Sequence, residues 1–320
     1  MTLTPADFRP VALQDRDFFA AHYALYPQTH SDNTFTNMVC WNHYAGYRFA
    51  RVRGSVILSS TIGGVTRFRP PIGPRDPELM GDLLRLAGEE GDGEPVVLID
   101  TETAAWMRSV FPGLELVPDR DHFEYVYLAK DLAELPNGQY HSARRQLNKF
   151  RQKCNYTVEP MALESCPEVK EFLVRWCEWK QCDGDPVLEN EKDAALFAID
   201  HFSELGLSGL LIRVDGKIGA MTIFEPLNAD TALVHFEKGL PDCEGIYKAI
   251  NAEAAAVMAR DFTYINRESD LGNPGLREAK TRYHPHHMVE VYTLRNRCTS
   301  ESCSGVQSCS LSRARVSTRW

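Results

Sequence analysis

Charged and amide side chains cluster directly after a short apolar segment near the C-terminal end of the chain. The apolar segment is 262–265, and the polar residues that follow it are Asn266, Glu268 and Asp270. Open α/β sheets place their sites at strand ends, because the strand fixes position while the loop stays accessible. We therefore predict that these three side chains hold a substrate ammonium group. Internal salt bridges are the alternative explanation of the same charges.

The next segment is predicted to be a short basic helix. It carries Arg277 and Lys280, and Tyr283 follows it closely. Guanidinium and ammonium groups on one helix are suited to binding an anion. We assign all three residues to substrate binding.

A second set of candidates lies on segment 231–237, whose alternation predicts a strand. His235 and Glu237 are two residues apart, so we expect them on the same face. A histidine and a carboxylate placed together can act as a general base and the group that orients it. The predicted catalytic groups are Glu237, His235 and Asp270. A half-buried pair with a structural role is the alternative for the two strand residues.

Segment 141–154 is predicted to form an amphipathic helix. Leu147, Phe150 and Cys154 follow helical spacing and form its buried stripe. From residue 136 to 157 there are five Lys or Arg residues and no acidic ones, so the usual helical salt-bridge partners are missing. Phosphate or RNA-end binding is therefore predicted for Arg144, Arg145, Lys149 and Lys238. A solvated basic face is the alternative.

The composition is that of an ordinary globular protein long enough for two domains. Of its 320 residues, 43% are hydrophobic and 25% are charged. A net charge of −9 argues against a general nucleic-acid coat, because phosphate binding needs concentrated Lys and Arg. No apolar run approaches the ~20 residues of a transmembrane helix. The N-terminus has no basic segment followed by an apolar core, so we predict a cytoplasmic location.

The cysteines and histidines suggest neither a disulfide framework nor a metal site. The nine cysteines are scattered, and the spacing between Cys177 and Cys182 has no second pair of the kind that binds zinc. We predict free thiols. His284, His286 and His287 are predicted to be structural or surface residues, because Pro285 interrupts any helical ligand pair.

The order of predicted elements divides the chain into two similar halves. The second half contains helices, a hairpin with an Asp-Gly turn at 215–216, then strand, helix, strand and helix. The first half shows a weaker version of this order. We predict an α/β protein with one domain at 1–135, a second at 136–297, and a disordered Ser/Cys/Arg-rich tail at 298–320.

Two sequence blocks carry a family resemblance. The first joins 123–128 to 140–150, and the second runs from Asn266 to Tyr283. Together they resemble soluble bacterial proteins related to the C-terminal domain of phosphatidylglycerol lysyltransferase, from about Asp17 to about Leu294. The resemblance implies two tandem acetyltransferase-like (GNAT) domains with mixed sheets flanked by helices, and a site in the second domain.

The loop after strand 231–237 departs from the pattern of coenzyme-A-using acetyltransferases. Those enzymes carry an Arg/Gln-x-x-Gly-x-Gly/Ala turn, whose backbone N–H groups hold the pyrophosphate. Here only Gly239 and Gly245 remain, and Pro241, Asp242 and Glu244 lie between them. Two acids would repel a pyrophosphate. The loop therefore argues against coenzyme A.

We accordingly expect an acyltransferase that moves an aminoacyl group from charged tRNA to a hydroxyl or amine. The expected partners are the tRNA acceptor end and a small-molecule or lipid acceptor. No cofactor is expected beyond aminoacyl-tRNA as co-substrate, with acetyl-CoA as the alternative donor. An acyl-CoA-dependent N-acyltransferase and a non-catalytic binding module are the two other functions that the sequence allows.

Overall fold

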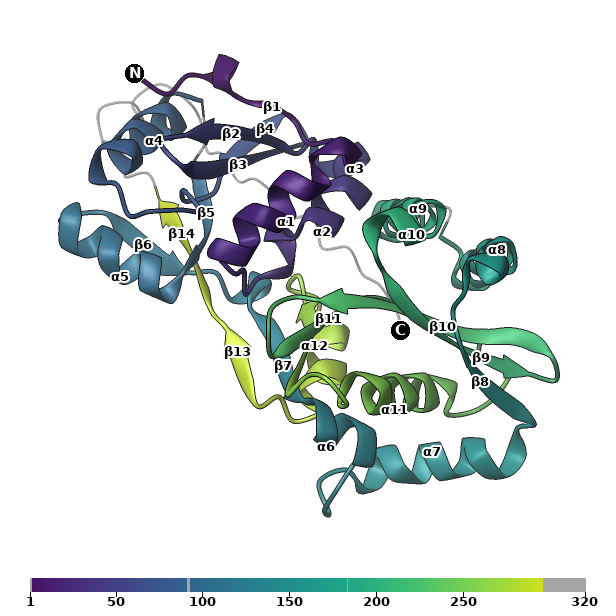
Figure 1. Cartoon of the computed structure of the whole chain (residues 1–320). Helices are drawn as coiled ribbons and strands as arrows, with labels where there is room; N and C mark the ends of the chain where they lie inside the picture. Colours follow the sequence, from purple (N-terminus) through teal and green to yellow (C-terminus); the bar gives the residue numbers. More distant parts are fainter. Residues whose placement is uncertain (1, 91–92, 183, 296–320) are drawn as a thin grey trace, which may run out of the picture.

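The computed structural model describes residues 2–90, 93–182 and 184–295. The predicted tail at 298–320 lies outside these ranges. Two mixed seven-stranded sheets form the frame (Figure 1). In spatial order, the first contains β1 (Arg9–Pro10), β2 (Arg48–Val52), β3 (Ser55–Ile62), β4 (Val65–Phe68), β5 (Val96–Asp100), β14 (Val291–Arg295) and β6 (Glu115–Pro118). The second contains β13 (His287–Val289), β7 (Glu124–Leu128), β12 (Tyr264–Ser269), β11 (Thr231–Gly239), β10 (Lys217–Pro226), β9 (Ser208–Val214) and β8 (Tyr156–Pro160).

Each sheet contains a parallel pair joined by a crossover helix. In the first sheet β4 and β5 are parallel, and α4 (Pro77–Glu90) connects them. In the second β11 and β12 are parallel, and α11 (Ile246–Met258) connects them. This repetition agrees with the predicted pair of similar α/β halves. The predicted hairpin turn is confirmed, because Asp215 and Gly216 both have positive φ between β9 and β10.

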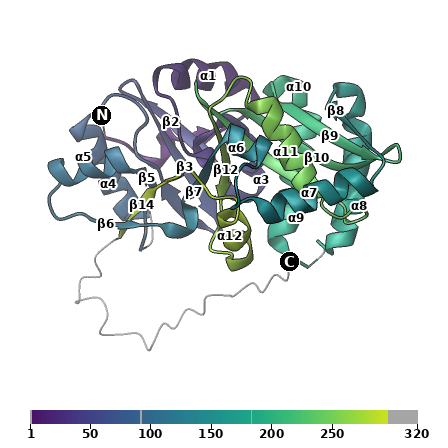
Figure 2. The same ribbon diagram turned by 90° about the horizontal axis from the view of Figure 1, so that it is seen from below.

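Helices cover the outer face of each sheet. The first sheet packs against α4 and α5 (Thr101–Val110), which bury Leu83 and Met107. The second packs against α6 (Ala129–Glu134), α7 (His141–Lys153) and α11, which lie side by side in Figures 1 and 2. α7 buries one apolar stripe, as the spacing of Leu147 and Phe150 predicts, whereas α11 is buried on most of its surface.

A third core lies between the two sheets and is shared by both halves. The helices around it are α1 (Arg16–Leu25), α2 (Phe35–Cys40), α3 (Asn42–Ala45), α8 (Cys166–Lys180), α9 (Pro186–Asp200) and α10 (Phe202–Leu205). Phe19 and Met38 from the first half and Phe172 and Ala198 from the second are all fully buried in it. Full burial of one large apolar side chain contributes about 1.5–3 kcal/mol. The shared core therefore couples the two halves energetically.

The two sheets also exchange strands. β7 precedes residue 135 but pairs with β12 in the second sheet, whereas β14 returns from the second half to pair with β5 in the first. Figure 1 shows the yellow segment β13–β14 running from one sheet to the other. The predicted boundary at residue 135 therefore does not separate the two sheets. Sequence order could not reveal this, because strand pairing is decided by tertiary contacts.

The prediction of free thiols is wrong for four cysteines. Cys154 at the end of α7 is bonded to Cys243 before α11, 89 positions further along the chain, and Cys177 is bonded to Cys182. The first pair joins segments that only the folded chain brings together. Cys40 and Cys166 are free and buried.

None of the helices within the described ranges combines the length and apolar character needed to cross a membrane.

Candidate functional site

The second sheet opens between its two parallel strands. β11 and β12 pair only through Thr231–Tyr264, Ala232–Ile265 and Leu233–Asn266. Beyond these positions the strands separate, although β11 continues to pair with β10 as far as Gly239. Because β11 and β12 no longer pair with each other there, the gap between them is the natural place for a site in this domain.

A bulge in β11 changes which face its polar side chains occupy. Phe236 pairs with Ile223 and Val234 with Phe224, which leaves His235 as the extra residue. Val234 packs with α11, whereas Phe236 packs in the shared core on the opposite face. The expectation that His235 and Glu237 share a face is therefore wrong. Glu237 faces α11, and His235 faces the first half of the chain.

Glu237 is the centre of a polar cluster on the α11 face. The Arg267 guanidinium of β12 lies 3.0 Å from its carboxylate, and the Asn251 amide of α11 donates to it at 3.3 Å. Both members of the ion pair are largely buried. The Tyr283 ring lies beside them, 5.1 Å from the Arg267 guanidinium. The structure thus brings predicted residues Glu237 and Tyr283 together across the opening.

Lys248 belongs to the same cluster and was not identified from the sequence. It lies in the first turn of α11, with its ammonium 4.3 Å from the centre of the Tyr283 ring. Burial, together with the positive charge of Arg267, lowers the pKa of Lys248 to about 8. An amine with such a pKa gains and loses a proton near neutral pH. No local sequence signal marks it, because the burial comes from tertiary packing.

His235 forms a separate group with two carboxylates. Its Nε2 is 2.9 Å from Glu225 of β10, and its Nδ1 is 3.6 Å from Glu268 of β12. Burial alone would lower the pKa of His235, but the hydrogen bond to Glu225 and the negative charge of Glu268 outweigh it and raise the pKa to about 9. The imidazole is therefore protonated at neutral pH. This state is unsuited to the general base predicted for it and suits a positioning role.

The turn containing Glu268 is strained and held by two side chains. Glu268 has φ of +60°, an uncommon backbone conformation for a residue other than glycine. The Asn266 carbonyl accepts from the Glu268 backbone N–H at 2.8 Å. Lys280 donates to three consecutive backbone carbonyls, including those of Glu268 at 3.1 Å and Ser269 at 2.6 Å. Lys280 therefore supports the turn instead of meeting a substrate anion as predicted.

Asp270 has a structural environment. Its carboxylate is fully buried and accepts from Arg277 Nε at 2.9 Å, Tyr125 Oη at 2.6 Å and Arg120 Nη1 at 3.1 Å. Burial alone would raise the pKa of Asp270, but the bonds from Arg277 and Tyr125 outweigh it and lower the pKa to about 2. A permanent carboxylate enclosed by donors positions Arg277 and does not exchange protons near neutral pH. This geometry disagrees with the predicted catalytic role for Asp270 and the predicted anion-binding role for Arg277.

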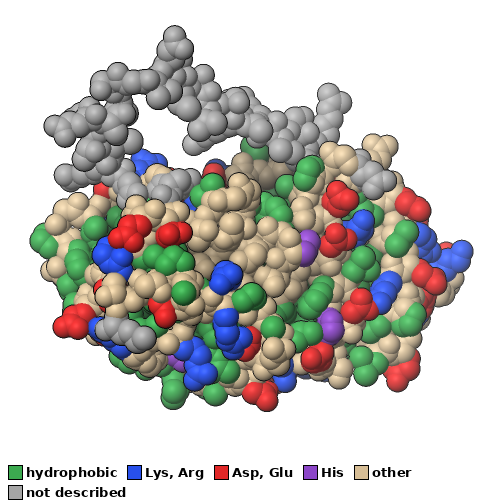
Figure 3. Space-filling view, turned by 90° about the horizontal axis from the view of Figure 1, so that it is seen from above, with side chains coloured by type: hydrophobic (Ala, Val, Ile, Leu, Met, Phe, Trp, Pro, Cys, Tyr) green, Lys and Arg blue, Asp and Glu red, His purple; other side chains and the backbone are tan. Residues whose placement is uncertain are grey.

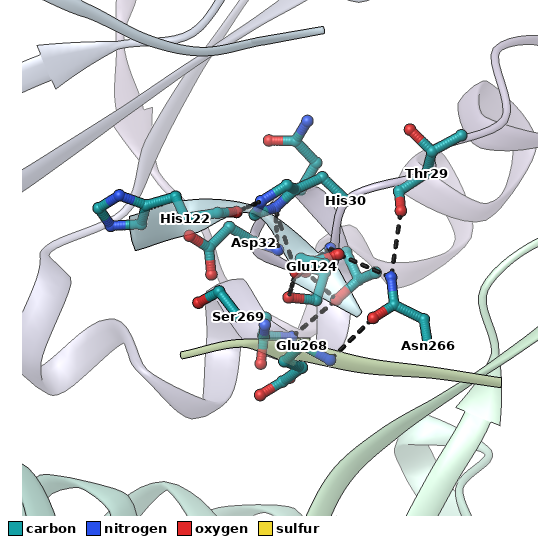
Figure 4. A network of polar contacts seen from close by, with 12 residues as sticks. Thr29, His30, Asp32, His122, Glu124, Asn266, Glu268 and Ser269 are labelled. Carbon is teal, nitrogen blue, oxygen red and sulfur yellow. Dashed lines mark hydrogen bonds and ion pairs between the residues drawn. The ribbon is translucent and has the colours of Figure 1, made fainter. Parts of the chain in front are cut away.

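A buried network joins the two halves of the chain beside this turn (Figure 4). Glu124 of β7 is fully buried, and its carboxylate accepts from the Ser31 backbone N–H at 3.1 Å and the Asn266 amide at 2.7 Å. His30 Nδ1 lies 3.4 Å from it. Burial raises the pKa of Glu124, and the positive field of His30 opposes the rise. Asn266 is thus occupied internally. A carboxylate within the apolar strand 124–128 was the signal that could have identified Glu124.

The exposed face of α7 carries the predicted phosphate-binding residues. A hollow of about 430 Å³ on this face is lined by His141, Arg144, Arg145, Asn148, Lys149 and Gln152. Arg145 is exposed, whereas Arg144 donates to the backbone carbonyls of Leu135 and Asn137. On the face seen in Figure 3, basic and acidic side chains are interspersed. The lining of the α7 hollow contains no acidic residue, which makes it distinctive.

Lys238 is turned away from that face. It is buried, 2.6 Å from Glu191 of α9 and 4.3 Å from the centre of the Trp176 ring. Its place after the bulge directs it toward α8 and α9. Lys238 therefore stabilises the packing of β11 and is not placed for the predicted phosphate contact.

α7 closes over the N-terminal end of α11. Gly245 has φ of +94°, and a Cβ atom there would lie 2.4 Å from the backbone carbonyl oxygen of Gln146. Lys149 forms an ion pair with Glu244 at 2.8 Å, which lowers the pKa of that carboxyl. Beside the contact is a second hollow of about 300 Å³, whose lining includes Trp179, Tyr247 and Lys248. The loop that holds a pyrophosphate in coenzyme A enzymes is here packed against a helix.

Comparisons with known proteins agree with this architecture. A conserved protein of unknown function from Bacteroides thetaiotaomicron is 29% identical with a TM-score of 0.84, over 92% of this chain and 100% of that one. The C-terminal domain of a putative lysylphosphatidylglycerol synthetase from Agrobacterium fabrum is 13% identical with a TM-score of 0.63, over 88% of this chain and 92% of that one. L-PGS from Bacillus licheniformis is 15% identical with a TM-score of 0.62, over 89% of this chain and 92% of that one. Curated protein sequences yield no match.

The sequence profile described as "Phosphatidylglycerol lysyltransferase, C-terminal" matches residues 23–295. The tandem acetyltransferase-like fold predicted from the sequence is confirmed, with mixed sheets flanked by helices. The fold is of the acyltransferase type. The chain belongs to the family of the phosphatidylglycerol lysyltransferase C-terminal domain.

Proposed function

We propose that this protein transfers an aminoacyl group from charged tRNA to an amine or hydroxyl acceptor, in the opening between β11 and β12. Membership in the phosphatidylglycerol lysyltransferase family supports an acyl transfer. The cluster around Glu237 and Lys248 supplies groups suited to moving protons in such a reaction.

The packing of α7 on α11 is the observation that carries the choice of donor. The N-terminal end of a helix attracts a pyrophosphate only when its backbone N–H groups are accessible. Here Gly245 contacts the Gln146 carbonyl so closely that a Cβ atom has no room, and Asp242 and Glu244 add negative charge. An aminoacyl ester does not require a pyrophosphate cradle. The geometry therefore favours aminoacyl-tRNA over acyl-CoA.

The RNA is proposed to bind along the basic hollow of α7. Arg145 is exposed there and accessible to phosphate, and Lys149 lies between this hollow and the one that contains Lys248. Electrostatic attraction by Lys and Arg supplies most sequence-independent affinity for RNA. An acceptor end lying along α7 would bring its terminal ester toward the start of α11, close to the cluster around Glu237.

The proposed chemistry uses the two sides of that cluster. The acceptor nucleophile attacks the ester carbonyl, and Glu237 takes the proton that the nucleophile loses. The bond between the carbonyl carbon and the ribose oxygen then breaks, and protonated Lys248 gives a proton to that oxygen. Arg267 holds the Glu237 carboxylate in place at 3.0 Å.

Ligand binding to the full chain tests this function. We would measure thermal stability with acetyl-CoA and, separately, with a non-hydrolysable aminoacylated acceptor stem. Occupancy stabilises the folded state by roughly 2.7 kcal/mol at a hundredfold excess over Kd. Stabilisation by the acceptor stem alone is expected. Stabilisation by acetyl-CoA alone would replace the proposal with an acyl-CoA-dependent transfer, and a bound stem with no turnover of any donor would indicate a binding module.

A further inference from the structure

Arg69 is a buried cation that has no anionic partner among the described residues. It directly follows β4 in the first half of the chain and is 3% exposed. Its Nε and Nη1 atoms are buried and have no hydrogen-bond acceptor among the residues that the structure describes. A buried charge without a partner is strongly unfavourable, so such a group is retained where a ligand completes it. Most other buried charges here have partners, as Glu124 and Asp270 show.

Arg69 occupies in the first sheet the position that the Glu237 cluster occupies in the second. It lies where the parallel strands β4 and β5 separate, because they pair only through Phe68 and Val96. Its guanidinium lies 5.1 Å from the centre of the ring of Tyr47, which is part of the core shared by both halves. The Tyr47 hydroxyl hydrogen-bonds to Arg69. The group therefore lies at the junction of the two halves.

Two carboxylates also act electrostatically on the Tyr47 hydroxyl. Burial, together with the negative charges of Asp32 and Glu268, raises the pKa of Tyr47 to about 12, and Arg69 opposes the rise. Asp32 forms no ion pair within the described ranges, and Glu268 is 3.6 Å from His235. Arg69 and these carboxylates thus act on one hydroxyl without bonding to one another. The charges are held apart in an arrangement that matches a ligand with both signs.

A second unpaired atom belongs to Asn33, which is bonded to Tyr23. Burial raises the pKa of Tyr23 of α1, and the positive charge of Arg69 opposes the rise. The Tyr23 hydroxyl donates to the Asn33 backbone carbonyl at 2.6 Å. The side-chain oxygen of Asn33 is buried and accepts no hydrogen bond from the described residues. An unused donor and an unused acceptor in one neighbourhood indicate a polar ligand and not a single inorganic anion.

We propose that the junction binds a free α-amino acid, with its carboxylate on Arg69 and its ammonium toward Asp32 and Glu268, and that this amino acid is the acceptor of the transfer. The inference rests on the proposed function and names its acceptor class. Arg69 lies against Tyr47, which packs in the shared core that Phe236 of β11 also faces, whereas Glu237 faces α11. Donor and acceptor would therefore approach the opening from its two sides.

The reaction balances with this acceptor. The ammonium first loses a proton, and the amine nitrogen attacks the ester carbonyl to form a C–N bond. The C–O bond to ribose then breaks. Of the two protons lost by nitrogen, one passes to the ribose oxygen and the other reaches solvent through Glu237. The products are an N-aminoacyl amino acid, deacylated tRNA and one proton.

Direct binding tests the site without turnover. The probes are glycine, L-alanine, L-serine and L-lysine, with glycinamide as the probe that lacks a carboxylate, at up to about 10 mM. Calorimetry and thermal shift would compare the full chain with Arg69→Met and with Arg75→Met, an exposed arginine outside the junction. We expect at least one amino acid to bind, glycinamide not to bind, and Arg69→Met to weaken binding by about 100-fold.

The unliganded variants give a second readout. Because Arg69 has no carboxylate bonded to it among the described residues, Arg69→Met is expected to melt no lower than the unchanged chain, whereas an arginine with a structural ion pair would lower the melting temperature. A lower melting temperature with amino-acid binding unchanged would overturn the proposal, as would equal binding of glycinamide or no binding of any amino acid. If the acceptor stem binds and amino acids do not, only this inference fails. If amino acids bind and the stem does not, the proposed donor fails and the site remains.

Discussion

At the scale of single residues, two groups two positions apart on β11 perform different tasks. The bulge at His235 turns the imidazole toward Glu225 and Glu268 and leaves Glu237 facing Arg267. His235 is held as a cation by its neighbours, whereas Glu237 lies in the opening between the parallel strands. The raised pKa of His235 follows from these surroundings and not from residue type.

His235 makes stability depend on pH. Its folded-state pKa of about 9 lies above the unfolded value of 6.5, so its contribution is fully present below pH 6.5 and is lost as pH rises toward 9. We expect the free energy of unfolding to fall by roughly 2 kcal/mol between pH 6.5 and pH 8. Above pH 8 the lowered pKa values of Lys248 and Lys280 act in the opposite direction.

Urea unfolding at several pH values measures this effect. His122 also has a raised pKa, so the informative quantity is the difference between the unchanged chain and His235→Gln. The variant should show a flatter pH dependence. An equal slope in both proteins would contradict the assignment of a protonated His235.

Glu237 is expected to be needed for turnover and not for folding. Glu237→Gln keeps the size of the side chain and removes the proton acceptor, so kcat should fall by roughly 100-fold to 10,000-fold. Binding of the acceptor stem should be unchanged. The matched control is Glu253→Gln on α11. Glu253 forms an ion pair with Arg151 at 2.9 Å, and this pair lies away from the opening. Equal activity of both variants would remove Glu237 from the mechanism.

At the scale of elements, α7 and α11 define how a donor can approach. α7 presents its basic side chains to solvent and packs its backbone on the loop before α11. The disulfide between Cys154 and Cys243 and the ion pair between Lys149 and Glu244 join the same two segments. The contact thus excludes one class of ligand from the helix end and offers a charged surface to another.

The α7 surface is expected to make salt-dependent contacts with RNA. Arg145→Ala should weaken binding of the acceptor stem and reduce the slope of log K against log salt by about 0.7–0.9, the loss of one phosphate contact. The control is Lys217→Ala, an exposed lysine at the β9–β10 hairpin. If both variants behave like the unchanged chain in a filter-binding titration, the RNA does not follow α7.

The close approach of the two helices should be visible in stability. Gly245→Ala places a Cβ atom against the Gln146 carbonyl and also forces positive φ on alanine. Gly216→Ala has the same backbone penalty, about 1–2 kcal/mol, with no atom within 4 Å of the new Cβ. We expect Gly245→Ala to lower the free energy of unfolding by about 1–3 kcal/mol more than Gly216→Ala does, as measured by chemical denaturation. Equal costs would mean that α7 yields freely and that the helix end is accessible.

At the scale of the whole molecule, the two acetyltransferase-like halves form one folding unit. The central core takes Phe19 and Met38 from the first half and Phe172 and Ala198 from the second. β7 and β14 each complete the sheet of the other half. Glu124 carries a buried polar network across the junction (Figure 4). A site at this junction therefore exists only in the complete fold.

Fragments 1–135 and 136–297 are expected not to fold separately. Each would lose a strand of its sheet and expose one side of the shared core. Circular dichroism and NMR dispersion of the isolated fragments, compared with the full chain, test this. The full chain should unfold in a single transition, and the mixed fragments should recover structure that neither has alone. Cooperative unfolding of either fragment would contradict the shared core.

The sequence determined the family, the fold class and most helices, because these depend on local patterns. The buried stripe of Leu147 and Phe150 and the Asp-Gly turn at 215–216 follow from spacing and backbone preference alone. The sequence also indicated that the loop containing Asp242 and Glu244 is unlike a pyrophosphate cradle. It placed Glu237 and Tyr283 among the candidates, and these two meet in the structure.

Only the tertiary structure decided which polar residues are free to act. A bulge of one residue separated His235 from Glu237, and packing against distant elements occupied Asp270, Arg277, Lys280 and Lys238 with internal partners. The same packing lowered the pKa of Lys248 and left two Arg69 nitrogens without a hydrogen-bond acceptor among the described residues. Burial and pairing are properties of contacts between residues far apart in the chain, which is why spacing along the sequence could not show them.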